Sequence, residues 1–577
     1  MTFLSARPAP TLADELNFRA RACLLRLRRA AMEFAATGLQ RPLGASRALA
    51  DAPIVAEARS ALWTNVGGAK DFALTAGKVH NLRVALRGLD GIVVPAGETF
   101  SFWRQIGRPS RGRGFVEGRE LREGCLIPSP GGGLCQLSNA LYEAARQAGF
   151  EIVERHAHTR IVPGSRAAIG RDATVFWNYV DLRFRSREAF RVEARMTRDA
   201  LIVAFRALGA GARTHSAPLA EAPAARHAND CTSCGETSCR HENGGGPLEA
   251  AASSAWVVDG CSPEFATLFR RLAKPADALL LPTRHFAHLR YAWPAGICGR
   301  EGTATFATLR RSIDLRGAGH GGALQARAMA ADARLAAAYP QRLWLLEKHA
   351  YVAQNLLPHL WRLGVLQGRS FSVLMERLPI EMLQAELDAA ARAYPQSATL
   401  ADFRAPAEVV EAEKEALAEA RELFTAHREI AACYPEKTTL LDWAAPAPMR
   451  ARRGGRSVLL PASGLARKGA YALREAIAGL DLELLIAGAA EEGADFWKGL
   501  PVRKLRRGEK PAELAAVVLP AIVEHQPRAL LASLAAGIPV IATPACGLSP
   551  RPGVTFVVPM NALTLRVALV AALADAG

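Results

Sequence analysis

The last 125 residues constrain the fold most, because short apolar runs alternate there with stretches of helical pattern. The apolar runs are typical of buried strands and comprise SVLLP (457–461), LELLIA (482–487), AVVL (516–519), IPVIAT (538–543) and TFVVP (555–559). Helices are expected from Ala470, from Pro527 to Gly537, and at the end of the chain. Strands that alternate with helices form a parallel sheet covered on both faces, and ligands of such sheets bind beyond the carboxyl ends of the strands.

The chain has 577 residues, enough for three to four domains. Half of the residues are apolar and 22% are charged, which is typical of globular proteins. We expect a multi-domain α/β protein with five parts: a helical lead-in (1–55), an α+β domain (56–207), a cysteine-containing linker (208–252) and two Rossmann-like domains (253–440 and 441–577).

The formal net charge of +17 favours anionic partners, although an excess of arginine throughout the chain explains it equally well. Nothing in the sequence specifies nucleic-acid readout, so no nucleic-acid partner is expected. The basic segment Asn17–Arg29 has apolar residues at helical spacing. It could lie on an anionic membrane surface or pack on the next domain.

The first residues lack a secretory signal, and no segment has the pattern of a membrane span. We therefore expect a cytoplasmic protein, and contact of residues 17–29 with the inner membrane face stays open. The ten cysteines should then be reduced, so that clustered cysteines indicate metal binding or catalysis rather than disulfides.

Cys135 is the first candidate catalytic residue. It follows three glycines (131–133) and opens a stretch of helical periodicity, so it should lie in the first turn of a helix, where the helix dipole favours thiolate. His156, His158 and Asp172 follow. The order Cys, His, Asp is that of papain-like cysteine hydrolases and transferases, with His158 as the preferred base and Asp172 as its orienting acceptor. A ligand pocket without covalent chemistry and a purely structural role stay open.

Three separated blocks of this region resemble the VanW family. They are PAGETFSFWRQIG (95–107), GGGLCQLSNALYEAARQAGFEIVERHAHTR (131–160) and GRDATVFWNYVDLRF (170–184). The resemblance covers about 130 residues, and the blocks agree in order. It implies an α+β domain and a link to the cell envelope. The biochemical activity of the family is not established, so the resemblance implies no particular reaction.

The linker contains the spacing C-x2-C-x4-C-x-H, formed by Cys231, Cys234, Cys239 and His241. Four such ligands suit tetrahedral zinc in a structural site. Cys261 in place of His241 would give four thiolates, which would also suit an iron–sulfur cluster. A redox-active pair of cysteines and an unliganded linker are the alternatives.

The segment VVLPAIVEHQPRALLASLAAGIPVIATPACGL (517–548) resembles the donor-binding block of retaining GT-B glycosyltransferases of the family-four type, with Glu524 at its start. Upstream, LLPASGLARKGAYALREAI (459–477) resembles the strand and Lys-Gly helix start of that family and places Lys468 and Gly469. Two pieces, HAYVAQNLLPHLWRLG and FTAHREIAACYP, resemble its amino-terminal half.

This second resemblance implies a nucleotide sugar as donor substrate. Lys468 would bind its diphosphate, with further amide donors at the helix that starts near Pro527, and Glu524 would bind sugar hydroxyls. The sequence also departs from the family. Ala532 stands where the second Glu of the family is expected, and Ser463 stands where an Arg is expected.

These features predict glycosyl transfer from a nucleotide sugar to a small-molecule or glycan acceptor of the cell envelope or of secondary metabolism. The VanW-like part would handle the acceptor or modify it through Cys135. Two alternatives remain: a non-catalytic glycan- or nucleotide-binding protein, and a cysteine-dependent amide hydrolase or transferase that uses the VanW-like part.

Overall fold

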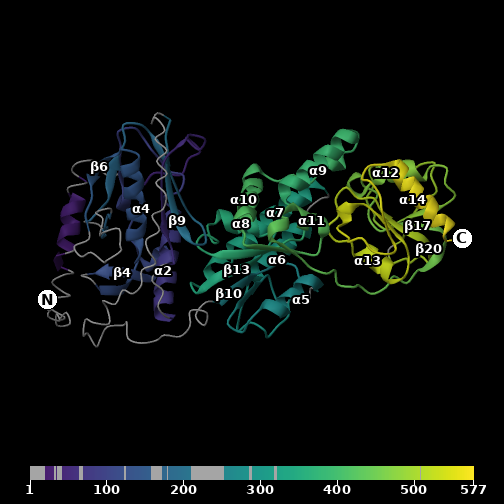
Figure 1. Ribbon diagram of the computed structural model, residues 1–577, viewed down its shortest axis with the longest axis horizontal. Helices are drawn as coiled ribbons and strands as arrows, with labels where there is room; N and C mark the ends of the chain where they lie inside the picture. Colours follow the sequence, from purple (N-terminus) through teal and green to yellow (C-terminus); the bar gives the residue numbers. More distant parts are fainter. Residues whose placement is uncertain are drawn as a thin grey trace. The chain divides into compact units, whose positions relative to one another are not determined.

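The computed structural model describes residues 20–21, 23–31, 34, 42–63, 69–122, 125–157, 172–177, 180–208, 253–284, 289–316, 321–506 and 508–576 (Figure 1). The chain divides into two compact units. Unit 1 holds Met1–Ser253 together with Trp344–Lys348 and Gly364–Ser370, and unit 2 holds the remaining residues to Gly577.

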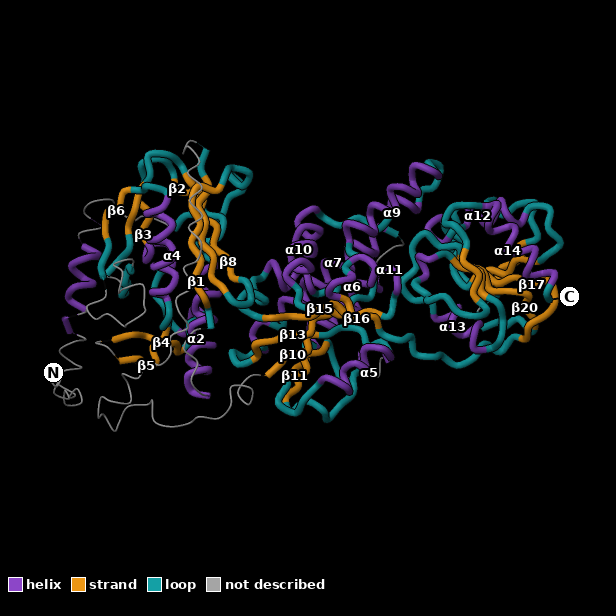
Figure 2. The backbone as a smooth tube through the Cα atoms, viewed as in Figure 1, coloured by secondary structure: helices purple, strands orange, loops and turns teal. Residues whose placement is uncertain are grey.

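Unit 1 is built on antiparallel sheets with helices against them, as the strand and helix colours of Figure 2 show. Its four-stranded sheet has the order β1 (Ile54–Ala61), β9 (Ala200–Arg206), β8 (Phe190–Met196), β2 (Val93–Val94). A three-stranded sheet has the order β3 (Thr99–Ser101), β7 (Arg183–Arg185), β6 (Glu151–Glu154), and a hairpin joins β4 (Glu117–Arg122) to β5 (Cys125–Pro130). The helices are α2 (Ala69–Leu86), α3 (Phe102–Ile106) and α4 (Leu134–Gln147).

The core of unit 1 is aromatic. The rings of Phe150, Phe184, Phe190 and Phe205 lie 4.6 to 6.2 Å apart between centroids. Three of these four side chains are fully buried, on strands β7, β8 and β9. They join the two larger sheets of the unit, so the expected α+β class is confirmed.

The first sheet of unit 2 has seven strands in the order β12-β11-β10-β13-β14-β15-β16. The strands are β10 (Ser253–Val257), β11 (Ala278–Leu281), β12 (Arg300–Thr303), β13 (Glu347–Ala353), β14 (Ser370–Leu374), β15 (Glu422–Thr425) and β16 (Thr438–Leu440). The helices are α5 (Pro263–Leu272), α6 (Thr305–Arg316), α7 (Gly322–Ala337), α8 (Leu357–Arg362), α9 (Ile380–Ala393), α10 (Ala407–Glu419) and α11 (Arg428–Cys433).

The second sheet of unit 2 has six parallel strands in the order β19-β18-β17-β20-β21-β22. The strands are β17 (Arg452–Leu460), β18 (Glu483–Ile486), β19 (Val502–Lys504), β20 (Glu513–Leu519), β21 (Val540–Ala542) and β22 (Val554–Phe556). The helices are α12 (Ala470–Ile477), α13 (Arg528–Ala535) and α14 (Ala562–Ala574).

Numbered along the chain, this sheet has the order 3-2-1-4-5-6, which is that of a doubly wound Rossmann fold, and the first sheet begins in the same way. The expected class of two Rossmann-like domains after an α+β domain is therefore confirmed. Strand order reverses between β17 and β20 in one sheet and between β10 and β13 in the other. Ligands of this fold bind at such points of reversal, beyond the carboxyl ends of the strands.

The expected strands and helices of the last domain are confirmed, and one further strand was not foreseen. β19 has three residues, and its Arg503 and Lys504 are exposed. A short polar edge strand has no apolar run, so the sequence pattern could not reveal it.

The described part of the N-terminal basic segment is helical. Its Arg26 Nε donates to the Trp177 carbonyl over 2.7 Å, and its Arg29 bonds the Glu154 carboxylate over 3.0 Å. Leu24 and Leu27 are 69% and 64% exposed. At least two of its arginines therefore contact unit 1 itself, and contact with a membrane stays a prediction. Within the described ranges, every helix is too short or too polar to cross a membrane.

Replacing Gly469 by alanine should destabilise unit 2 strongly. Gly469 has φ +82°, and a Cβ there would lie 2.0 Å from the Pro520 carbonyl oxygen. Gly479 has φ +70° with no atom within 4 Å, so Gly479→Ala is the matched control that carries backbone strain alone. We expect the free energy of unfolding to fall by about 1 kcal/mol in Gly479→Ala and by about 3 kcal/mol in Gly469→Ala. Thermal unfolding of the two variants measures the difference, and equal midpoints would contradict this close approach.

Candidate functional site

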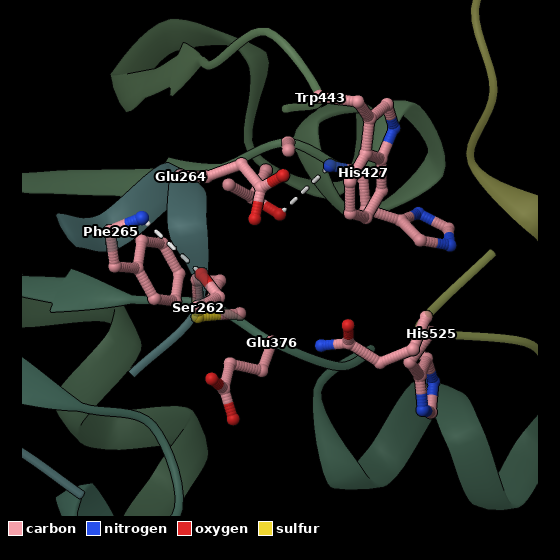
Figure 3. A pocket seen from close by; sticks show the side chains of 11 residues that line it. Ser262, Glu264, Phe265, Glu376, His427, Trp443 and His525 are labelled. Atoms are coloured by element: carbon pink, nitrogen blue, oxygen red, sulfur yellow. Dashed lines mark hydrogen bonds between the residues drawn. The ribbon is translucent and has the colours of Figure 1, made fainter. Parts of the chain in front are cut away.

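A cleft in unit 2 lies at the carboxyl ends of strands from both Rossmann-like domains (Figure 3). The first domain contributes the residues after β10, β14 and β15, and the second contributes the loop after β20. The lining residues are Ser262, Glu264, Phe265, Met375, Glu376, Thr425, Ala426, His427, Trp443, His525 and Gln526. Figure 3 shows Ser262 and Glu264 on one side of the cleft and His525 on the other.

Lys468 and Glu524 form an ion pair where the strand order of the second domain reverses. The loop after β17 carries Lys468, and the loop after β20 carries Glu524. The Lys468 Nζ lies 2.9 Å from a Glu524 carboxylate oxygen and also donates to the Val523 carbonyl over 3.0 Å. Gly469 brings the two loops together, because only a residue without Cβ fits against Pro520.

The Glu524 carboxylate also organises the start of the following helix. Its second oxygen accepts from the amides of His525 and Gln526, both over 2.8 Å. Burial by itself would raise the pKa of Glu524, but Lys468 and these amides outweigh it, and the pKa is lowered below its ordinary value. Glu524 is therefore ionised, and Lys468 and the two amides fix its carboxylate in the loop at the edge of the cleft.

His427 connects the two domains across the cleft. Its Nδ1 accepts from the Ile430 amide at the start of α11, so Nε2 carries the proton and donates to the Glu524 carbonyl over 2.8 Å. Burial lowers the pKa of His427, which keeps it neutral near pH 7. Gly547 makes room for the ring, because a Cβ there would lie 2.3 Å from it.

A second ion pair closes the cleft. The Glu264 carboxylate, in the first turn of α5, binds the Arg528 guanidinium with two hydrogen bonds, one of them 2.7 Å long. Burial opposes the charge of Glu264, but the hydrogen bonds from Arg528 and the Ala444 amide lower its pKa. Arg528 also stacks on Trp443, 5.3 Å from the ring centre. The remaining cavity is about 20 Å³, room for one water molecule.

Two of the residues that line this cleft carry a carboxyl group, Glu264 and Glu376. Glu376 is the second residue after β14, and its backbone amide donates to the Gln354 side chain over 3.0 Å. It is an exposed residue on the rim of the cleft. Crowding by nearby protein, followed by the charge of Asp259, raises the pKa of Glu376 to about 7, and water at the exposed side of the carboxyl group screens this effect. A carboxyl group with this pKa can both donate and accept a proton near neutral pH.

The positions at which the sequence departs from the glycosyltransferase family lie close to the backbone of neighbouring elements. The Ala532 carbonyl accepts from the Met449 amide over 2.9 Å. The Ser463 backbone packs against Gly488, where a Cβ would lie 2.3 Å away. Arg467, the nearest arginine in sequence to Ser463, stacks on Phe403 at 5.0 Å. Arg467 therefore contacts the ring of Phe403, in the turn that precedes α10 of the first domain.

The sequence analysis missed Glu264, Glu376, His427, Trp443 and Arg528. Two of these residues could have been found from the sequence, because they stand soon after buried strands. Glu264 follows the helix start Ser262-Pro263 soon after a buried strand, and Glu376 is the second residue after another. Both positions lie at the carboxyl end of a strand, where ligands of parallel sheets bind. The contacts of His427, Trp443 and Arg528 depend on how the two domains meet, which no local pattern reveals.

In unit 1, Cys135 is the second residue of α4, so the expected place in the first helical turn is confirmed. Its Sγ lies 3.7 Å from the Thr174 hydroxyl and 3.8 Å from the Val175 carbonyl. The Asp172 carboxylate binds Arg155 over 2.9 Å, and His156 binds Glu154 over 3.1 Å. His158 lies outside the described residues, so its pairing with Cys135 and Asp172 stays a prediction.

The proposed metal ligands Cys231, Cys234, Cys239 and His241 also lie outside the described residues. Within the described ranges, no group of three or more His, Cys, Asp or Glu side chains could hold a metal ion. Cys261, the alternative ligand, is described: its thiol is half-buried, and burial raises its pKa to about 12.

The comparisons with known proteins confirm the resemblance of the first module. Residues 77–206 match the family described as VanW like protein. The "Uncharacterized protein YoaR" of Bacillus subtilis (strain 168) is 40% identical over 108 residues, covering 19% of this chain and 35% of that protein. The "Vancomycin B-type resistance protein VanW" of Enterococcus faecalis is 34% identical over 112 residues, covering 19% and 41%. The chain thus spans less than half the length of these curated relatives.

Solved structures similar to this one include glycosyltransferases. Sucrose-phosphate synthase from Thermosynechococcus elongatus is 14% identical with a TM-score of 0.34, and the match covers 56% of this chain and 90% of that chain. The lipopolysaccharide outer core galactosyltransferase WaaB is 12% identical with a TM-score of 0.33, with the same coverage. Our assignment of two Rossmann-like domains rests on the strand order of unit 2 and not on these scores.

Replacing Glu376 by glutamine should stabilise the protein increasingly as pH rises. An unfolded carboxyl group ionises near pH 4.3, as a typical value, whereas Glu376 in the folded state keeps its proton to about pH 7. The stability contributed by the protonated group is therefore lost as pH rises through this window, and glutamine does not ionise. We expect the midpoint difference between Glu376→Gln and wild type to be larger at pH 8 than at pH 5. Glu386→Gln, on an exposed part of α9, is the control, and an equal difference at both pH values would contradict the raised pKa.

Proposed function

We propose that unit 2 binds a nucleotide sugar in its cleft and transfers the sugar to an acceptor. The observation that carries the proposal is the Lys468–Glu524 ion pair at the point where the strand order reverses. A cation and a carboxylate lie there at the carboxyl ends of two adjacent parallel strands, the place at which Rossmann folds bind nucleotides.

The chemistry of the two groups suits the two ends of such a donor. Lys468 supplies a positive charge for the diphosphate, which leaves with negative charge when the sugar bond breaks. Backbone amides in the first turn of α13 would supply further donors for phosphate oxygens. Glu524, released from Lys468, would accept hydrogen bonds from sugar hydroxyls. Glu376 would take the proton of the attacking acceptor hydroxyl, because its pKa lies near 7.

Donor binding requires the cleft to open. Its cavity of about 20 Å³ admits one water molecule, and a nucleotide sugar is far larger. The Glu264–Arg528 pair and the His427 hydrogen bond would have to separate. Arg528, at the first residue of α13, would then be a second cation near the diphosphate.

Binding without transfer is a second candidate function. Two observations favour it: Ala532 supplies no carboxylate for the nucleotide ribose, and Ser463 supplies no cation for the phosphates. Arg467 offers no evident replacement, since it stacks on Phe403. Turnover of the donor distinguishes the two functions.

Nucleotide sugars should raise the unfolding midpoint of the protein and be hydrolysed slowly. We expect Lys468→Met to weaken donor binding about tenfold or more, since a charge-assisted hydrogen bond is worth about 1.5–3 kcal/mol. Glu524→Gln should lower donor hydrolysis by more than it lowers binding. A thermal-shift and hydrolysis panel of uridine, guanosine, adenosine and thymidine diphosphate sugars measures both.

Lys498→Met is the matched control, because it removes the same charge from an exposed lysine of the same domain. Binding that is unaffected by Lys468→Met would reject the site. Binding that depends on Lys468, without hydrolysis of any donor, would establish the second candidate function instead of glycosyl transfer.

The remaining parts of the proposal concern the acceptor and the place of action. We propose a small-molecule or glycan acceptor of the cell envelope, handled by the VanW-like domain, and action in the cytoplasm or at the inner membrane face. The VanW-like match at residues 77–206 supports the link to the envelope. Catalysis by Cys135, with His158 as base and Asp172 as orienting acceptor, stays a separate proposal for this domain.

Zinc at the linker cysteines is also a proposal, and it has a direct test. Protein purified without oxygen should contain about one zinc per chain, held by Cys231, Cys234, Cys239 and His241, or one iron–sulfur cluster held by the same three cysteines and Cys261. Elemental analysis of wild type and of the Cys231→Ser/Cys234→Ser variant measures this. The Cys433→Ser variant, which changes a half-buried thiol of unit 2, is the control. Metal-free wild type would exclude the site.

A further inference from the structure

The turn before α4 in unit 1 brings backbone segments unusually close together. Gly131 and Gly133 have φ of +82° and +98°, and a Cβ on Gly132 would lie 2.2 Å from the Gly118 carbonyl oxygen. Gly133 is the N-cap residue of α4, a helix of 14 residues, and no side chain caps the helix. Among the described residues, no acceptor binds the amides of Gly133 and Cys135. The turn thus leaves donors at the positive end of a helix.

Lys78 of α2 lies directly against this turn. An ideal Cβ on Gly133 would be 2.1 Å from the Lys78 Cγ, so the lysine side chain crosses the surface of Gly133. Lys78 is 8% exposed, and no hydrogen bond or ion pair joins its amine to the described residues. Its Nζ is not among the fully buried unpartnered atoms of the described residues, so water or a small anion can reach it.

The electrostatic surroundings of Lys78 are positive. Burial, followed by the charge of Arg119, lowers the pKa of Lys78 to about 7. The Arg119 guanidinium donates to the Thr75 hydroxyl over 3.2 Å, on the same helix α2. Two cationic side chains and the N-terminus of α4 therefore gather here, a combination that attracts an anion and repels a cation.

We propose that Lys78 and the amides at the start of α4 form a binding site for an oxyanion, either the carboxylate or the phosphate group of a ligand of unit 1. The anion would be an ion-pair partner for Lys78 and would accept from the amides of Gly133 and Cys135. The glycines allow this approach, because a side chain on Gly133 would occupy the space that Lys78 crosses.

Cys135 gives the site a built-in reporter. It is the second residue of α4 and partly exposed, so its thiol lies in the same helical turn as the proposed anion donors. An anionic alkylating reagent should be drawn to the site, whereas a neutral reagent of similar size should not. The ratio of the two alkylation rates does not depend on how much of Cys135 is thiolate, because the same thiolate attacks both reagents.

The first experiment compares iodoacetate with iodoacetamide on the full-length protein at pH 7, following the Cys135 peptide by mass spectrometry. We expect the iodoacetate to iodoacetamide rate ratio to fall roughly tenfold in Lys78→Met, since one charge-assisted contact is lost. Lys498→Met should keep the wild-type ratio. An unchanged ratio in a folded Lys78→Met variant would overturn the proposal.

The second experiment uses wild type alone and so does not depend on whether the variant folds. Inorganic phosphate or acetate should protect Cys135 from iodoacetamide, relative to chloride at equal ionic strength, with exposed Cys23 as the internal reference. Protection by phosphate alone assigns the site to a phosphate group, and protection by acetate assigns it to a carboxylate. Equal alkylation of Cys135 in phosphate, acetate and chloride would overturn the proposal.

Discussion

The reversal of strand order in its two sheets is the constraint on which the structure of unit 2 depends. In a doubly wound sheet the two central strands lead their following loops in opposite directions, which leaves a crevice between the loops. In the second domain, Lys468 and Glu524 meet in that crevice. In the first domain, Asp259 follows β10 and is held by Arg311 at 2.8 Å and Asn355 at 2.8 Å. Each crevice is thus closed by a carboxylate bound to a cation.

Internal ion pairs give the cleft a closed state with little unfavourable charge. Each carboxylate there is paired with a cation: Glu264 binds Arg528, and Glu524 binds Lys468. His427 is neutral, so it connects the two domains without adding charge. Phosphate groups would compete for the same two cations, so binding and opening would be coupled by exchange of partners. The proposed site at α4 in unit 1 differs, because no described residue forms an ion pair or a hydrogen bond with the Lys78 amine.

Much of this architecture could be predicted from local sequence. The apolar runs before Pro461 and after Ile538 predicted buried strands, and the glycines before Cys135 predicted its place in a first helical turn. Lys468 and Glu524 were predicted separately, from the resemblance to GT-B glycosyltransferases, and both follow strands that end at one edge of the sheet. The edge strand β19 could not be predicted, because its polar residues resemble a loop. Glu376 could have been found by the same edge argument, but its raised pKa depends first on the protein around it and then on Asp259, which is more than a hundred positions away in the sequence.

The sequence by itself determined the parallel sheets of the last two domains, which follow from local periodicity. The order of modules and the candidate residues Lys468 and Glu524 came from resemblances to known families. Only the tertiary structure decided that Lys468 binds Glu524, that Asp172 binds Arg155, and that Lys78 lies buried against Gly133. The reason is physical: hydrogen bonds, burial and pKa shifts depend on which groups approach within a few ångströms, and residues distant in the chain make most of those approaches.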